Sequence, residues 1–283
     1  MLAISLYDIL TCDKCGSSIR RFQGGFECQS LVCRSKWPII DDKFYYQISA
    51  TKVLTSNSIR TELENANAWR KSNYCFYMSE FSNIQNYNVL DIGTGRGHFI
   101  DIFGRQNNLV CLDFLPYKDV DVVVNFENGL PIKSGIFDVV VLSNVLEHSF
   151  NISELLSETS RVLKSGGIVL GTVPFMTKVH QKPYDFHRPT NYALERFLAE
   201  AHFHSIEVYP LNSLFELFAQ NVKTFFSLSA LSNTKLDFKI IKRLFEFMIK
   251  VTTPIISRNS QLTSDFTIGF SFKATNGNPP LLD

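Results

Sequence analysis

A short apolar stretch that ends in a carboxylate and runs directly into a glycine-rich turn is the most informative part of this sequence. Residues 89–92 form the stretch and contain Asp91, and Gly93, Gly95 and Gly97 follow at every second position. Glycine accepts positive φ and has no Cβ, so the backbone of such a turn is able to approach a ligand closely. The pattern predicts a strand, a turn and a helix that together bind a nucleotide-type cofactor.

The spacing of the glycines favours one kind of cofactor. It is G-x-G-x-G, whereas a dinucleotide turn uses G-x-G-x-x-G to place a pyrophosphate on the following helix N-terminus. S-adenosylmethionine carries no phosphate and needs no such cradle. A second apolar run, residues 109–112, ends in Asp113, an acid about 20 residues beyond the first glycine, as expected for a group that holds ribose hydroxyls.

More short apolar runs follow at regular intervals and predict further strands. They cover residues 120–124, 137–142 and 168–172, with a helix predicted over 98–105 and another that ends on the glycine pair Gly166-Gly167. Continuous β-branched runs bounded by turn residues are typical of buried parallel strands. The sequence therefore predicts an α/β fold. Residues 204–209 and 266–273 predict two more strands, with a helix over 191–201 ahead of them.

Four ordered motifs over about half of the chain resemble the class I S-adenosylmethionine-dependent methyltransferases of the type 11 group. The chain matches "LDIGxGxG" at residues 90–97, "LPxxxxxFDxV" at 130–140, "NVLEH" at 144–148 and "RVLKxGG" at 161–167. The resemblance implies a Rossmann-like, mostly parallel sheet whose last strand is reversed. It also implies an S-adenosylmethionine-dependent methyltransferase.

The resemblance also implies which residues meet the cofactor. The candidate cofactor-binding residues are Asp91, Gly93, Thr94, Gly95, Gly97, Asp113, Phe114, Asn125, Phe126 and Asn144. In this scheme Asp91 positions the methionine amino group, Asp113 takes the ribose, and Asn125 with Phe126 meets adenine. Family members usually carry aspartate where this chain has Asn125, and an amide carbonyl is a weaker acceptor than a carboxylate. The alternative is a degenerate fold in which the glycines only make tight turns.

Four of the six cysteines lie in the first 33 residues and are spaced like metal ligands. They are Cys12, Cys15, Cys28 and Cys33. Two pairs of closely spaced cysteines, each on one tight turn, complete a closed tetrahedral zinc site with a structural role. The segment resembles the short zinc-ribbon modules found in front of bacterial methyltransferases, although Asp42 stands where their tail has glycine. A ribbon that has lost its metal or forms disulfides is the alternative.

The rest of the chain predicts the domain organisation and the compartment. We expect a zinc-ribbon-like domain over residues 1–49 and a methyltransferase domain over 50–283, with a helical insertion over 211–258. A net charge of +1 gives no general attraction to nucleic acid. The start of the chain lacks the features of a secretory signal, so we expect a cytoplasmic protein. The basic segment 235–258 predicts peripheral membrane contact or packing on its own domain or on a second copy in a homodimer.

A polar and aromatic segment, residues 179–190, follows the fifth strand and is predicted to close over the acceptor. It resembles the "PYDxxRxT" segment of family members from glycan and cell-surface biosynthesis clusters. Two histidines are candidate catalytic bases because imidazole titrates near neutrality: His187 in this segment, and His148 after the fourth strand. The alternative role for His148 is a structural hydrogen bond. The alternative for the segment is a solvated loop whose Thr190 caps the next helix.

These features predict methyl transfer to a small-molecule, sugar or lipid-linked acceptor, with a role in glycan or cell-surface biosynthesis. Two alternatives remain open at this stage. One is an rRNA base methyltransferase, since some of those enzymes begin with a C-x2-C ribbon. The other is a non-enzymatic docking protein in which the ribbon and the basic segment bind partners.

Overall fold

The structure is a computed structural model, and it describes residues 5–46, 66–212 and 265–277 together with six isolated positions. Those positions are Glu216, Phe218, Arg243, Leu244, Phe247 and Val251. Most of the predicted insertion 211–258 and of the basic segment 235–258 therefore lies outside the described residues. Within the described part, no helix has the length and apolar character needed to cross a membrane.

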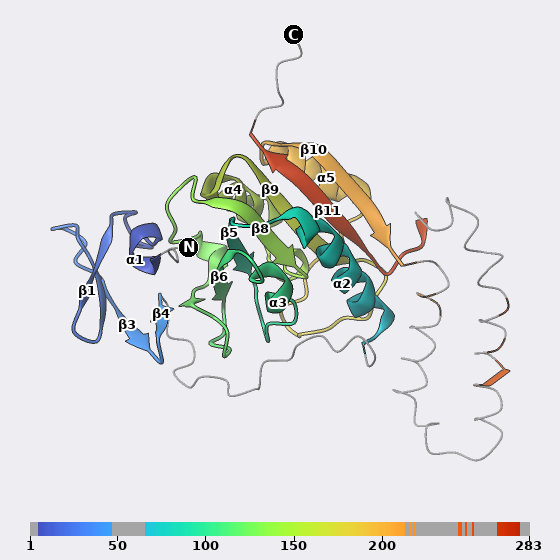
Figure 1. Cartoon of the computed structure of the whole chain (residues 1–283), viewed down its shortest axis with the longest axis horizontal. Coiled ribbons are helices and arrows are strands. Elements are labelled where there is room, and N and C mark those ends of the chain that lie inside the picture. The colour runs from blue at the N-terminus through green and yellow to red at the C-terminus, as the bar shows by residue number, and fades with distance from the viewer. Residues whose placement is uncertain are drawn as a thin grey trace, which may run out of the picture.

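The fold is built on one long mixed sheet (Figure 1). Its strand order is β1-β2-β3-β4-β7-β6-β5-β8-β9-β11-β10, where β1 to β4 are the N-terminal strands Ile19–Phe22, Gly25–Cys28, Lys36–Ile40 and Lys43–Tyr45. The seven strands of the main part are β5 (Asn88–Ile92), β6 (Asn108–Asp113), β7 (Val122–Val123), β8 (Phe137–Ser143), β9 (Leu163–Pro174), β10 (Phe203–Leu211) and β11 (Gly269–Asn276). Strands β7, β6, β5, β8 and β9 run parallel, and β11 is antiparallel to both β9 and β10. The predicted α/β sheet with a reversed last strand is confirmed.

Alternating residues of the central strands pack on two separate cores, as expected for a sheet covered on both faces. Leu90 of β5 belongs to the larger core, which includes leucines of α4 (Ile152–Val162) and α5 (Asn191–Glu200). Its neighbour Val89 belongs to a second core with Tyr77 of α2 (Ala68–Glu80) and Phe103 of α3 (Ile100–Phe103). Helices therefore cover both faces, and the ligand site is left to the strand ends.

Local side-chain caps explain where three of the helices begin. The side chain of Asn67 accepts from the amide of Arg70 at the start of α2. The side chain of Asn151 accepts from the amide of Glu154 at the start of α4. Thr190 accepts from the amide of Ala193 at 3.2 Å, so the predicted helix that begins after Thr190 is confirmed as α5. Each such cap satisfies an amide that would otherwise lack a partner and stabilises its helix by about 1 kcal/mol.

The N-terminal segment forms a small antiparallel unit that continues the main sheet (blue in Figure 1). It consists of α1 (Leu6–Ile9), β1 (Ile19–Phe22), β2 (Gly25–Cys28), β3 (Lys36–Ile40) and β4 (Lys43–Tyr45). Strand β4 pairs in parallel with β7, and Leu10 forms a bridge with Ile132. Phe26, Trp37 and the core of the main sheet belong to one apolar cluster. The N-terminal unit is therefore bound to the sheet by both hydrogen bonds and a shared core.

Two local predictions differ from the structure. The helix predicted to end on Gly166-Gly167 ends earlier, at Val162, and strand β9 begins at once with Leu163. The glycine pair lies inside β9, where the pairing with β8 shifts register and Gly166 has a φ of +76°. The pair therefore makes an irregularity in the strand. The helix predicted over 98–105 is only the single turn of α3.

Candidate functional site

The candidate cofactor residues gather at one edge of the sheet, where the parallel strands end. Asp91 lies near the end of β5, Asp113 is the last residue of β6, and Asn144 follows β8 directly. Asn125 lies two residues beyond β7. In open α/β sheets this carboxyl edge is where ligands bind, because the loops after each strand meet there.

The glycine turn after β5 adopts the left-handed backbone that its sequence predicts. The φ angles of Gly93, Gly95 and Gly97 are +74°, +56° and +73°. A Cβ on Gly93 would lie 2.4 Å from a methyl group of Val145, so this glycine is required by the protein's own packing. A Cβ on Gly95 would meet only one atom within 4 Å, a backbone oxygen at 3.9 Å. The turn is therefore open on the Gly95 side, as far as the described residues go.

Asp91 is buried and holds an unsatisfied acceptor. Its side chain is 3% exposed, and Oδ1 has no hydrogen-bond partner among the described residues. Burial raises the pKa of Asp91 to about 7. A buried carboxylate oxygen without a partner is costly, so a cationic ligand group beside Oδ1 would be strongly favoured. This environment fits the ammonium group of S-adenosylmethionine.

Asp113 joins the glycine turn to the end of β6. Its Oδ2 accepts from the amide of Gly95 at 2.8 Å, and its Oδ1 accepts from the amide of Leu115 at 2.8 Å. Burial raises the pKa of Asp113, and these amides act in the opposite direction. Each carboxylate oxygen has two lone pairs, so both retain capacity for the hydroxyls of a ribose. The predicted ribose acid is thus also the group that fixes the turn.

The remaining cofactor candidates surround these two acids. The side chain of Asn125 accepts from the amide of Glu127 at 3.1 Å and caps the short helix η2 (Phe126–Asn128). Asn144 accepts from the indole nitrogen of Trp69 at 3.0 Å, which attaches helix α2 to the strand end. The structure thus gives Asn125 and Asn144 structural bonds. Their roles toward the cofactor stay predictions, as do those of Thr94, Phe114 and Phe126.

The predicted acceptor segment does pack on the carboxyl edge. The amides of Phe186 and His187 donate to the backbone oxygen of Glu147, at 2.8 and 3.3 Å, and Nδ1 of His148 contacts the backbone oxygen of Tyr184. Within the segment, Arg188 donates to both oxygens of Asp185 at 2.5 and 2.7 Å. The segment is therefore held to the short helix η3 (Leu146–His148), in addition to the helix cap made by Thr190.

The two candidate bases have different surroundings. Nε2 of His187 lies 3.1 Å from the backbone oxygen of Phe150. His148 lies beside two side chains that the sequence did not single out, Glu147 and His180. The signal for Glu147 was present in the "LEH" motif, but no spacing rule relates that motif to His180, which lies 32 positions after His148. Catalytic roles for His148 and His187 stay predictions.

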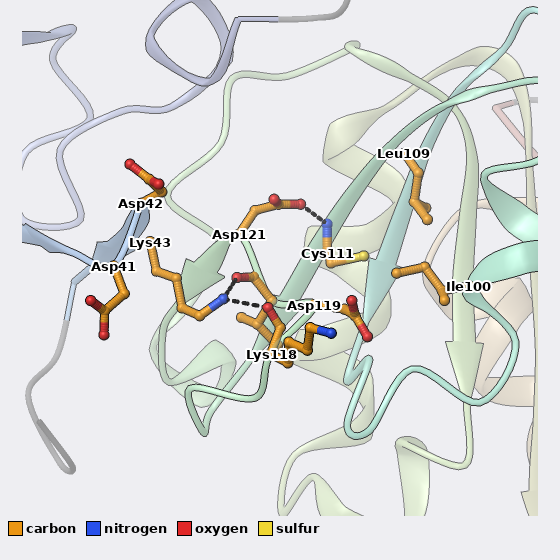
Figure 2. A pocket seen from close by; sticks show the side chains of 10 residues that line it. Asp41, Asp42, Lys43, Ile100, Leu109, Cys111, Lys118, Asp119 and Asp121 are labelled. Atoms are coloured by element: carbon orange, nitrogen blue, oxygen red, sulfur yellow. Dashed lines mark hydrogen bonds between the residues drawn. The ribbon is translucent and has the colours of Figure 1, made fainter. Parts of the chain in front are cut away.

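Two hollows lie away from this edge. One, of about 410 Å³, lies at the junction of the N-terminal unit and the main sheet (Figure 2). There the buried Lys43 donates to the backbone oxygens of Lys118 and Val120, at 2.7 Å each, which explains how β4 is held to the sheet. The other, of about 700 Å³, is lined by side chains of α2 and α3 and their loops, among them Tyr74 and Met78.

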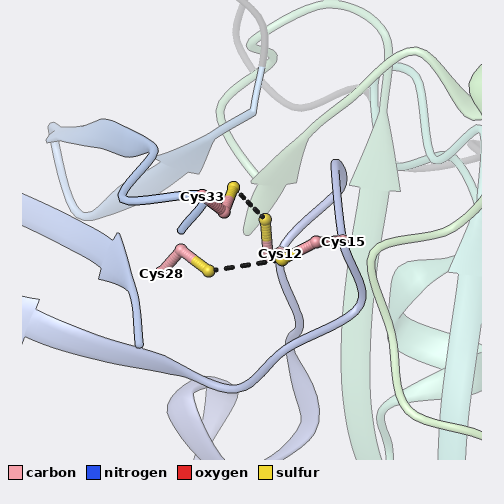
Figure 3. Close-up of side chains that lie close together, drawn as sticks. All are labelled: Cys12, Cys15, Cys28 and Cys33. Carbon is pink, nitrogen blue, oxygen red and sulfur yellow. Dashed lines mark hydrogen bonds between the residues drawn. The ribbon is translucent and has the colours of Figure 1, made fainter. Parts of the chain in front are cut away.

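The four N-terminal cysteines converge on one point (Figure 3). All four sulfur atoms lie within 4.8 Å of one another, with Cys12 and Cys33 at 3.6 Å and Cys15 and Cys28 at 3.5 Å. A disulfide would require about 2.05 Å. Four sulfurs around one zinc ion at about 2.3 Å lie roughly 3.8 Å apart, so the cluster fits a tetrahedral ion.

Two of the sulfurs accept backbone hydrogen bonds that suit thiolate ligands. The amides of Lys14 and Ser30 donate to the sulfurs of Cys12 and Cys28, at 3.4 and 3.3 Å. A hydrogen bond between Cys15 and the Ser17 hydroxyl lowers the pKa of Cys15 to about 6, which favours the thiolate. Burial raises the pKa of Cys12 to about 12, which favours the thiol. Amide donors stabilise the negative charge that sulfur carries when it binds a metal.

Comparison with known proteins identifies the family. The model of the methyltransferase domain family matches residues 66–221, which is more than half of the chain. The mixed sheet, with its antiparallel strand β11, has the architecture that the sequence resemblance implied. The chain therefore belongs to the methyltransferase domain family. This confirms the resemblance that the four sequence motifs predicted.

Individual relatives cover only parts of the chain. An uncharacterised protein of Methanocaldococcus jannaschii is 27% identical over 131 residues, 42% of this chain and 64% of the relative. A probable S-adenosylmethionine-dependent methyltransferase of Mycolicibacterium smegmatis is 27% identical over 131 residues, 43% of this chain and 51% of the relative. The chain thus matches less than two thirds of the length of these relatives.

Among solved structures, a phosphoethanolamine N-methyltransferase of Haemonchus contortus in complex with S-adenosylmethionine is 17% identical. It matches with a TM-score of 0.48 over 75% of this chain and 53% of that chain. An S-adenosylmethionine-dependent methyltransferase of Archaeoglobus fulgidus is 18% identical. It matches with a TM-score of 0.47 over 75% of this chain and 96% of that chain.

Proposed function

We propose that the protein transfers a methyl group from S-adenosylmethionine to a small-molecule, sugar or lipid-linked acceptor bound between the glycine turn and segment 179–190. The cofactor, when bound, supplies a methyl carbon made electrophilic by the adjacent sulfonium. Family membership supports the reaction class. The single observation that carries the proposal for this chain is the buried Asp91 carboxylate with an unsatisfied oxygen beside an open glycine turn.

The residues of the edge divide the work of binding. Asp91 holds the amino group of the donor, and Asp113 holds the ribose while it keeps the turn in place through the Gly95 amide. Trp69 covers the edge from helix α2 through its bond to Asn144. Because methyl transfer is an in-line displacement, most of the rate comes from holding two reactants at near-attack distance and excluding water.

The acceptor segment supports a small or extended polar acceptor. Tyr184 and Phe186 are exposed and lie on the segment that packs on η3, and aromatic faces of this kind suit sugar rings and acyl chains. The balanced net charge of +1 supports a neutral or weakly charged acceptor over RNA. The four-cysteine unit is proposed to have a structural role, and residues 1–49 and 50–283 are proposed as the two domains.

The proposal is tested by incubating the full-length protein with methyl-labelled S-adenosylmethionine and separated glycan, lipid, RNA and protein fractions. We expect label in the glycan or lipid fraction and none with Asp91→Ala. Label that enters RNA alone, with a steep dependence on salt, would replace the acceptor class with nucleic acid. Absence of cofactor binding in calorimetry would favour a non-enzymatic docking protein.

A further inference from the structure

Three side chains of metal-binding type lie together beside the acceptor segment. They are Glu147 and His148 in η3 and His180 in the loop after β9. One ligand atom from each lies within 4.8 Å of the others. These residues are separate from the four cysteines of the N-terminal unit, and they come from two segments that are far apart in sequence.

The Glu147 carboxylate is the unusual member of this cluster. It is fully buried, and neither of its oxygens has a hydrogen-bond partner within the described ranges. Its Oε1 lies 3.7 Å from Nε2 of His148 and 3.7 Å from Nε2 of His180, too far for direct hydrogen bonds. An uncompensated buried carboxylate costs several kcal/mol, so a positive charge is required near this oxygen.

The contacts of the Nδ1 atoms indicate which nitrogen of each histidine is able to bind a cation. Nδ1 of His148 contacts the backbone oxygen of Tyr184, which is only able to accept, so Nδ1 carries the hydrogen. The neutral ring then has its lone pair on Nε2, the atom nearest Glu147. A backbone carbonyl that orients a histidine through Nδ1 is the usual support of a histidine that binds a metal through Nε2.

His180 also has polar groups beside its Nδ1. Its Nδ1 lies 3.3 Å from Oδ2 of Asp185. Arg188 donates to that carboxylate oxygen at 2.7 Å, and its second Nη2 hydrogen faces Nδ1 of His180 at 3.4 Å. Metal binding through Nε2 requires the other tautomer, in which Nδ1 donates to Asp185. In that tautomer two imidazole lone pairs and one carboxylate oxygen face a common point, where they repel one another unless a cation lies between them.

The distances suit a metal ion at that point. Bonds of about 2.0–2.2 Å allow two ligand atoms to lie up to roughly 4.2 Å apart, and both separations of 3.7 Å fall within this limit. Because His148 and His180 are only partly buried, small rotations suffice to complete the triad. Two imidazoles and one carboxylate are typical ligands of zinc, manganese, iron and cobalt, whereas magnesium and calcium prefer oxygen atoms alone.

We propose that Glu147, His148 and His180 bind one divalent transition-metal ion beside the methyl-transfer site. Three protein ligands leave coordination positions for oxygen atoms of solvent or of the acceptor. Contact between the bound ion and the acceptor rests on the proposed function. Binding of the ion itself does not.

The test uses the full-length protein with its cysteine site filled by one equivalent of zinc. Calorimetric titration with Mn²⁺ and with Co²⁺ then measures the second site alone. We expect one further ion per chain for the wild type, and binding weaker by at least about 30-fold for Glu147→Gln and for His180→Gln. His187→Gln is the matched control, since His187 lies in the same segment but bonds to Phe150, and its affinity for the ions should stay within about 2-fold.

Two outcomes would overturn the proposal. One is a wild-type protein that takes up no ion beyond the zinc. The other is an affinity that is the same for His180→Gln as for the wild type; His180 lies on a partly exposed loop, so this variant is expected to fold even if Glu147→Gln does not. A parallel titration with S-adenosylmethionine separates the proposals: a protein that binds the donor but no ion keeps the proposed function and loses this site.

Discussion

The amide of Gly95 donates a 2.8 Å hydrogen bond to the Asp113 carboxylate, which connects the turn after β5 to the last residue of β6. One acid therefore does two things at this edge: it holds the glycine turn in its left-handed shape and presents lone pairs to a ribose. The second oxygen of the same carboxylate accepts from Leu115. The turn, the loop after β6 and the ligand are expected to be energetically coupled through this one side chain.

Asp113→Ala is expected to weaken S-adenosylmethionine binding by about 100-fold or more, because it removes both the ribose acceptor and the acceptor of the Gly95 amide. Asp113→Asn keeps one acceptor oxygen and should lose only about 10-fold. Calorimetry measures both. Asp138→Asn is the matched control: Asp138 also accepts a backbone amide, that of Asn88, but it lies at the start of β8. Equal losses for Asp113→Ala and Asp138→Asn would contradict the assignment.

The affinity for S-adenosylmethionine should depend on pH through Asp91. Burial raises the pKa of Asp91 to about 7, so the carboxyl group of the free protein is largely protonated below that pH. The donor's ammonium group favours the ionised form, so binding releases a proton from Asp91 and weakens as the pH falls from about 8 to 6. Asp91→Asn should bind weakly with no such dependence. A wild-type affinity that is flat across this range would be inconsistent with the role.

Purified protein is expected to contain about one zinc ion on the four-cysteine site. Metal analysis measures this ion in samples to which no metal has been added for the proposed site at Glu147. Cys28→Ser should lose this ion and destabilise the N-terminal unit, since metal binding supplies folding free energy to so small a unit. Cys75→Ser is the control, because Cys75 is exposed and lies far from the cluster in sequence. Retention of zinc by Cys28→Ser would exclude the proposed ligand set.

Asp42→Gly should stabilise the protein by about 1 kcal/mol. Asp41 and Asp42 form the turn between β3 and β4 with φ angles of +49° and +60°, a backbone that costs less for glycine. The zinc-ribbon modules that this segment resembles carry glycine at the position of Asp42. Thermal unfolding measures the effect, and Asp42→Ala, which keeps the strained backbone, serves as the comparison. A lower melting temperature for the glycine variant than for the alanine variant would refute this explanation.

The parts of the fold that the sequence predicts well are those with local signals. The carboxylate-tipped strand with Asp91, the strand that ends in Asp113 and the cap at Thr190 all follow from short patterns whose physics is local. The boundary at Gly166-Gly167 was wrong because a glycine pair suits both the end of a helix and an irregularity in a strand. Only the pairing of β9 with β8 decides between them.

What the sequence does not predict depends on contacts between distant segments. The bond from Trp69 to Asn144 spans 75 positions, and no pattern in either segment indicates it. The same is true of the parallel pairing of β4 with β7, which joins the cysteine unit to the main sheet. His180 meets Glu147 because the loop after β9 folds back on η3, so the cluster of three side chains exists only in the folded chain.

The central claim is that the carboxyl edge around Asp91 receives the methyl donor, and calorimetric titration of S-adenosylmethionine into wild type and Asp91→Ala at pH 8 tests it most directly. One molecule of donor should bind each wild-type chain, and the folded Asp91→Ala variant should show no measurable binding. Equal affinities for the two proteins, or no binding by the wild type, would contradict the account.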